Sequence, residues 1–172
     1  MTVHTGATAT DSSHPPVDNP QAIYQEGIVA GVLAAMAVAI WFLVVDSLAG
    51  RPFYTPSVLG AALFGRGVEL DKVTVSLPTV AMFTWVHGLV FAALGGMAAR
   101  LLAVAERNPS LGFGIVLFFV ILQSGFTTAV AFVAPTIFAV LGWVSIFVAN
   151  LLAAATMVAY FRLRHPRVTV RP

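Results

Sequence analysis

The sequence predicts an all-α integral membrane protein, a four-transmembrane-helix bundle with a short interfacial or re-entrant helix in its first, outer loop. Two observations carry this prediction. The 172 residues are 59% hydrophobic and only 9% charged, whereas about a quarter of the residues in soluble domains are charged. The chain also contains long uncharged runs, and a helix needs roughly 20 apolar residues to cross the hydrocarbon core of a bilayer.

The uncharged runs place the four spans. Gly27 to Val45 and Leu77 to Ala99 contain no Asp, Glu, Lys or Arg over 19 and 23 residues. Leu111 to Phe161 contains none over 51 residues, which suits two spans, and the turn between them is expected at Ala134 to Thr136 because Pro135 interrupts a helix. The predicted spans are 20–48, 78–105, 111–134 and 137–161.

The loop after the first span contains an apolar stretch that is too short to cross a membrane. Thr55 is expected to cap a helix over about 56–64, Pro56 to begin it and Gly65 to end it. A helix of this length and composition is interfacial or re-entrant. It either covers the outer end of the bundle, or forms a docking surface for another subunit or one wall of a ligand pocket.

The two tails differ from the membrane domain, which is expected over 20–161. Residues 1–19 are polar and rich in small residues and proline, which predicts a disordered tail ending in a helix start, with Asn19 as N-cap and Pro20 as first residue. Residues 162–172 form a basic tail. Four spans put both tails on one side of the membrane.

The basic residues predict the orientation. Six lie on the side of the termini and three on the other side: Arg100, Arg107, Arg162, Arg164, Arg167 and Arg171 against Arg51, Arg66 and Lys72. Basic loops stay in the cytoplasm. We therefore expect a multi-pass protein of the inner (plasma) membrane with cytoplasmic N- and C-termini.

Small residues recur every three to seven positions on three of the spans. Such seams let helix backbones approach closely, which is how spans associate in lipid. They serve packing within one chain or between copies in a homo-oligomer. The seams are Gly27, Gly31, Ala35 and Ala39; Thr84, Gly88, Ala92 and Gly96; and Gly142, Ala149, Ala153 and Thr156.

Three polar side chains, His87, Gln123 and Asn150, are expected near the mid-plane of the membrane. The structural interpretation is that a neutral His87 hydrogen-bonds Gln123, Asn150 or a backbone carbonyl across helices. The functional interpretation is a site, because an ionisable group inside the membrane is costly to bury. Proton handling, a quinone hydrogen bond or haem ligation are the open alternatives, and haem requires a second imidazole that only another copy supplies at this depth.

Two acidic residues flank the first span. Asp46 is expected to face the packed seam, as a salt-bridge partner of nearby Arg51 or a helix-end partner, or to form half of a pair with His87. Glu26, at the other boundary, is expected to be solvated or paired with an arginine of the C-terminal end.

No catalytic or metal-binding motif occurs, the chain has no cysteine, and its net charge of +2 does not indicate nucleic acid as a partner. We therefore expect no enzyme activity and no required cofactor. The expected partners are membrane lipids and either further copies or other membrane subunits. The favoured function is an accessory or structural subunit of a larger inner-membrane complex. The alternatives are a small oligomeric transporter or channel using His87 and Asp46, and an anchor or binder of a quinone or haem near His87.

Overall fold

The computed structural model describes residues 20–65, 69, 72–107 and 141–164, and the single positions 124, 128 and 139. This part of the chain contains four helices and no strand: α1 (Pro20–Leu48), α2 (Tyr54–Phe64), α3 (Leu77–Arg107) and α6 (Trp143–Arg164). Helices α1, α3 and α6 are long and apolar enough to cross a membrane. Apart from positions 124 and 128, the predicted span 111–134 lies outside the described residues. So do Gln123, the predicted turn at 134–136, the N-terminal tail 1–19 and residues 165–172.

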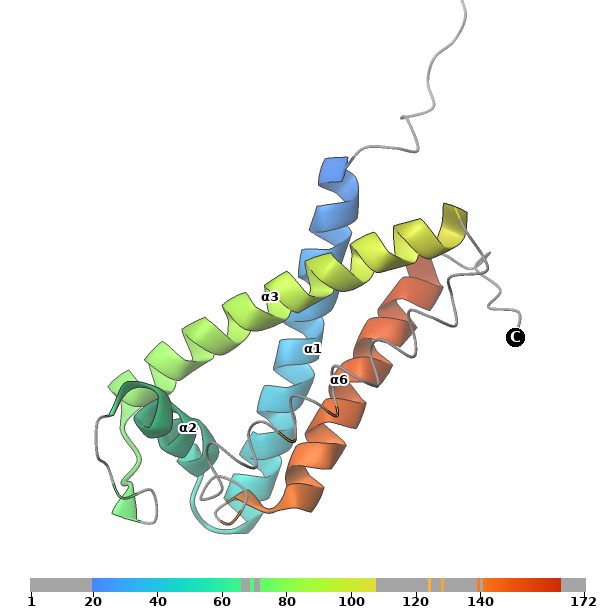
Figure 1. The fold of residues 1–172 in the computed structure, drawn as a ribbon. Coiled ribbons are helices and arrows are strands. Elements are labelled where there is room, and N and C mark those ends of the chain that lie inside the picture. The colour runs from blue at the N-terminus through green and yellow to red at the C-terminus, as the bar shows by residue number, and fades with distance from the viewer. Residues whose placement is uncertain are drawn as a thin grey trace, which may run out of the picture.

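Helix α1 is the centre of the described bundle (Figure 1). It packs against α3 on one side and α6 on another, and α2 folds back beside the start of α3. Both α3 and α6 run antiparallel to α1, because Arg100 near the end of α3 and Arg164 at the end of α6 contact the first two turns of α1. The start of α1 and the end of α6 therefore share one end of the bundle.

Helices α1 and α3 meet backbone to backbone through glycines. A Cβ atom on Gly27 would lie 2.5 Å from the Gly95 carbonyl oxygen, and one on Gly31 would collide with the Phe91 carbonyl. The seam predicted on α1 is buried at Gly27, Gly31 and Ala35, whereas Ala39 is exposed. The predicted seam on α3 is confirmed at Ala92 and Gly96, whose Cα atoms lie 3.0 and 2.6 Å from where Cβ atoms on Gly31 and Gly27 would be. It is wrong at Gly88, which has open space around it, and Gly95 joins the contact instead.

Helix α6 packs its small residues on the opposite side of α1. Ala149, Ala153 and Met157 form a buried cluster with Ala34 and Val38. Ala149 and Ala153 were expected on this seam, and Met157 continues it in place of Thr156. Small side chains make this contact close, which is the main source of attraction between helices in lipid.

Both predicted ends of the last helix need correction. Helix α6 begins at Trp143 and not at 137, because Gly142 has a φ of +75° and interrupts the helical path after Leu141. It also continues past 161 to Arg164, so part of the predicted basic tail is helical. Trp143 is consequently the first residue of the helix.

Helix α2 begins at Tyr54, two residues before its predicted start. Its N-cap residue is Phe53, which has the left-handed conformation at φ +65°. The Phe53 side chain makes no capping hydrogen bond. The prediction that Thr55 is the cap is therefore wrong. The predicted end at Gly65 is confirmed, and its N–H donates to the Ala61 carbonyl over 2.7 Å.

Large apolar side chains cover the outside of the long helices. Ile40 on α1, Trp85 on α3 and Phe147 on α6 are among the most exposed of them, whereas the buried positions are mostly alanine and glycine. Soluble proteins have the reverse distribution. An apolar exterior around a core of small residues is typical of a bundle surrounded by lipid.

Candidate functional site

Asp46, in the last turn of α1, is buried and bound on both carboxylate oxygens. Its side chain is only 5% exposed. Thr55 donates its backbone N–H to Oδ2 over 2.7 Å and its hydroxyl to Oδ1 over the same distance. Because these donors lie in the first turn of α2, the Asp46 carboxylate stabilises the positive end of that helix from a neighbouring element.

The turn between α1 and α2 brings these groups together. Arg51 N–H donates to the Asp46 carbonyl over 2.8 Å and Gly50 N–H to the Ser47 carbonyl over 3.0 Å, with Gly50 at φ +70°. These two bonds form a Schellman motif, the usual glycine-dependent end of a helix. The chain reverses within five residues, so α2 starts beside the end of α1.

Arg51 does not form the expected ion pair with Asp46. Its guanidinium carbon lies 4.0 Å from the centre of the Tyr54 ring, a cation–π distance. The hydrogen bonds from Thr55 take the Asp46 carboxylate instead. Of the two structural roles expected for Asp46, the helix-end partner is the one observed.

A second buried hydroxyl joins α2 to the segment before α3. Ser57 is fully buried, and its hydroxyl donates to the Phe53 carbonyl over 2.9 Å and accepts the Ser76 N–H over 3.3 Å. Helix α2 also packs closely on the start of α3, since a Cβ atom on Gly60 would lie 2.5 Å from Thr79 Cγ2. The loop helix is thus held to both neighbouring spans.

His87 contacts the α1 backbone at the middle of the bundle. Its Nε2 lies 3.3 Å from the Ala35 carbonyl oxygen, which can only accept, so this hydrogen bond requires the tautomer that carries its proton on Nε2. The ring lies between Phe83 and Phe91, with centroid separations of 5.6 and 4.6 Å. Of the expected His87 partners that lie in the described ranges, a backbone carbonyl across the helix contact is the one observed.

Asp46 and His87 are not brought together. Asp46 follows the His87 acceptor, Ala35, by eleven residues on α1, which is about 16 Å along the axis. Asn150 is half-buried on α6, next to Ala149 in the packed cluster, and no hydrogen bond joins it to His87 within the described ranges. Among the candidate residues that the structure describes, Asp46 therefore makes its contacts at one end of the bundle and His87 in the middle, and Gln123 lies outside the described residues.

The opposite end of the bundle is closed by charged and aromatic residues. The Glu26 carboxylate lies 3.3 Å from the Arg164 guanidinium. Glu26 was expected to be solvated or to pair with an arginine of the C-terminal end, and the pair is the one observed. Arg100 donates from Nη1 to the Tyr24 hydroxyl, an interaction between α3 and α1. These contacts tie the start of α1 to the ends of both other long helices.

Comparison of the chain with known protein families, with curated proteins and with solved structures finds no match.

Sequence reasoning missed three participants in these contacts. The Thr55 donors, the Ala35 carbonyl and the Tyr24 hydroxyl become partners only through tertiary contacts 9, 52 and 76 residues apart in the chain. Thr55 carried a local signal, since threonine beside a helix start is a hydrogen-bonding residue. The sequence around Ala35 contains no local signal that its carbonyl would accept a hydrogen bond.

Proposed function

We propose that this chain is a multi-pass inner-membrane protein, with cytoplasmic termini, that serves as an accessory or structural subunit of a larger membrane complex. One observation carries the proposal: the ionisable groups expected to do chemistry are used to join helices. Both Asp46 oxygens hold α2, and His87 Nε2 contacts α1. Groups that are committed to internal hydrogen bonds stabilise an architecture and are poorly placed to carry a proton or bind an ion.

The hydroxyl groups on the spans support the same role. Thr84 and Thr156 donate to the carbonyls of Val80 and Leu152, four residues earlier in their own helices, over 2.8 and 2.7 Å. Serine and threonine commonly satisfy themselves in this way inside a membrane. These groups add no polar lining to a path through the bundle.

The directions of the helices support a fourth crossing and termini on one side. Arg107 ends α3 at the end of the bundle where α1 begins, whereas Trp143 begins α6 at the opposite end. These are the two ends that a fourth span over 111–134 would connect. The excess of basic residues at the terminal end supports a cytoplasmic location.

Helix α2 offers the surface for a partner subunit. Its exposed large apolar side chains, Leu63 and Phe64, lie at its C-terminal end, near the start of α3. The helix itself is rigidly held through Asp46, Ser57 and Gly60, as described above. A fixed apolar helix at the outer end of a bundle suits contact with another membrane protein.

Gentle purification from the host membrane, followed by native mass spectrometry, tests this proposal. The wild-type chain should leave the membrane with other chains in fixed stoichiometry, and Leu63→Ser combined with Phe64→Ser should release them. Leu163→Ser, which changes an equally apolar exposed residue at the opposite end, is the matched control and should retain the partners.

Two other results would favour the alternative functions. A homo-oligomer without other chains, whose proton-dependent flux is lost in His87→Ala, would indicate a transporter. Quinone or haem that accompanies the wild-type protein and is lost in His87→Ala would indicate a ligand-binding anchor.

A further inference from the structure

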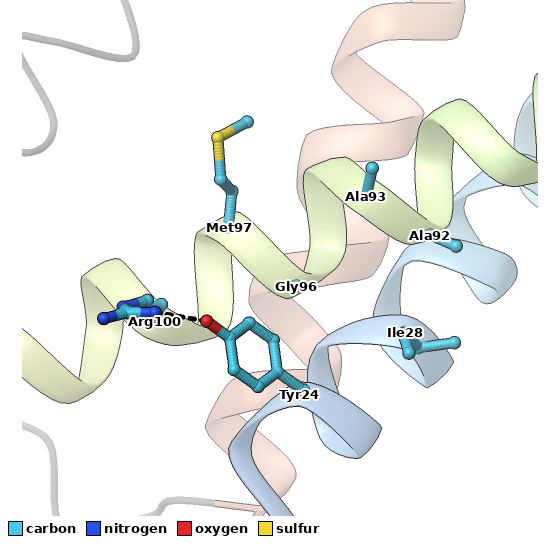
Figure 2. A pocket seen from close by; sticks show the side chains of 7 residues that line it. All are labelled: Tyr24, Ile28, Ala92, Ala93, Gly96, Met97 and Arg100. Atoms are coloured by element: carbon cyan, nitrogen blue, oxygen red, sulfur yellow. Dashed lines mark hydrogen bonds between the residues drawn. The ribbon is translucent and has the colours of Figure 1, made fainter. Parts of the chain in front are cut away.

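A groove of about 440 Å³ lies between α1 and α3 at the end of the bundle that holds the start of α1. Figure 2 shows Tyr24 and Arg100 side by side at one end of it, with the small residues of α3 further along. The volume falls in the range of ~300–1,000 Å³ that is usual for ligand sites. The side walls are apolar, and include Ile28 from α1 and Met97 from α3.

The groove exists because α3 has small residues here. Ala92, Ala93 and Gly96 leave the space open, and the Tyr24 ring lies against Gly96, with Cδ1 3.6 Å from where a Cβ atom would be. One turn after Tyr24, the contact between Gly27 and Gly95 holds the backbones of α1 and α3 at a fixed separation. The hollow is therefore part of the helix packing and does not depend on side-chain rotamers alone.

In the membrane insertion proposed above, the polar end of the groove falls at the depth of lipid headgroups. Tyr24 is 24 residues from Leu48 and Arg100 is 23 residues from Leu77, distances of about 36 and 34 Å along their helices. The hydrocarbon core is about 30 Å thick. Ile28 and Met97, roughly one turn nearer the centre, are about 30 Å from the same two residues and lie at the edge of this core. The groove thus places a cation at the interface and an apolar hollow directly below.

The charge at this end favours an anion. Arg100 uses Nη1 for the Tyr24 hydroxyl, and a guanidinium has five N–H donors, so donors remain for a phosphate. The Tyr24 hydroxyl holds the guanidinium beside the groove. The nearest described carboxylate on α1, Glu26, is paired with Arg164.

We propose that this groove binds one anionic glycerophospholipid of the surrounding membrane, with the phosphate at Arg100 and one acyl chain along the hollow between α1 and α3. The inference rests on the membrane insertion proposed above. It adds a defined lipid site to the bundle, whichever protein partners the chain has.

Native mass spectrometry of the detergent-solubilised protein, with phosphatidylglycerol or phosphatidylcholine of identical acyl chains added, tests the proposal. The wild type should retain phosphatidylglycerol at least fivefold better, since one basic residue near the surface favours an anionic lipid by roughly that factor. Arg100→Gln should remove the preference and Arg100→Lys should keep most of it. Ala93→Phe, which fills the hollow from its exposed side, should lower retention of both lipids.

Arg162→Gln is the matched control, because Arg162 is an exposed arginine at the same end but on α6. It should leave the preference unchanged. Equal loss in Arg100→Gln and Arg162→Gln would show a diffuse electrostatic effect and overturn the proposal, as would an unchanged preference in Arg100→Gln. Conversion of a dimer to a monomer by Ala93→Phe, with lipid retention unchanged, would show that a second copy occupies the groove and would also overturn it.

Alkaline extraction of membranes from the same cells tests insertion separately. Protein that resists extraction but shows no lipid preference contradicts the lipid site alone. Protein that is extracted contradicts the proposed membrane location, and with it both proposals.

Discussion

The Asp46 carboxylate accepts both the backbone N–H and the hydroxyl of Thr55, each over 2.7 Å, and so joins the end of α1 to the start of α2. The two side chains are 5% and 3% exposed. A carboxylate with two short hydrogen bonds at a helix start is a strong structural contact. It fixes the loop helix as a rigid part of the bundle.

Asp46→Ala should destabilise the protein by about 2–4 kcal/mol, because it leaves two buried Thr55 donors without an acceptor. Asp46→Asn keeps one acceptor oxygen and should lose less. The midpoint of unfolding in detergent, followed by circular dichroism, measures both effects. Thr55→Ser, which retains both donors, is the control, and an Asp46→Ala protein as stable as the wild type would refute the structural role of Asp46.

Glycines on α1 and α3 should tolerate alanine very differently. Gly31→Ala and Gly95→Ala place a Cβ atom against backbone of the facing helix, so the helices must separate, at a cost of about 1–3 kcal/mol. Gly88→Ala meets open space and should be neutral or stabilising by up to about 1 kcal/mol, since alanine favours a helix. Thermal unfolding of the three variants in one detergent tests the order, and equal effects at Gly88 and Gly95 would disprove this helix contact.

His87→Phe should change stability by less than about 1 kcal/mol, because it keeps an aromatic ring between Phe83 and Phe91 and loses one interhelical hydrogen bond, typically worth ~0.6 kcal/mol. His87→Ala also loses the ring and should cost more. Complementation of a deletion strain distinguishes structure from chemistry. A stable His87→Phe protein that fails to complement would assign His87 a chemical role.

Trp41 joins α1 to the start of α6. Its Nε1–H donates to the Ser145 carbonyl over 3.1 Å. Trp41→Phe should lower stability by about 0.5–1.5 kcal/mol, the usual net value of a hydrogen bond. Trp85→Phe is the matched control, since Trp85 is 71% exposed, and it should have no measurable effect. A larger loss from Trp85→Phe would indicate that a partner covers that residue.

The sequence predicts the long helices well because their limits depend on local chemistry. The first span agrees at both ends, 20 and 48, since Pro20 suits a helix start and the uncharged run has the length of a membrane crossing. Gly65 ends α2 as expected. Gly142 was expected on a packing seam, and its left-handed conformation, which shortens α6, depends on how the chain enters that helix.

The candidate site was predicted less well because its contacts are tertiary. Spacing alone placed Gly88 and Gly96 on one seam, whereas the crossing of α1 and α3 uses Gly96 together with Gly95 and leaves Gly88 in open space. Arg51 follows Asp46 closely in the chain, yet the Schellman turn presents Thr55 to the carboxylate and Arg51 to the Tyr54 ring. Neither the crossing nor the turn can be read from residue types.

Single-cysteine labelling of intact cells is the most direct test of the central claim, that the bundle is inserted in the membrane with its termini in the cytoplasm. The chain has no cysteine, so each introduced thiol is a unique reporter. Lys72→Cys should react with a membrane-impermeant maleimide in intact cells, Leu163→Cys only after lysis, and Leu89→Cys, in the middle of α3, in neither case. Equal labelling of Lys72→Cys and Leu163→Cys in intact cells would contradict the proposed orientation, and ready labelling of Leu89→Cys would contradict the insertion of α3.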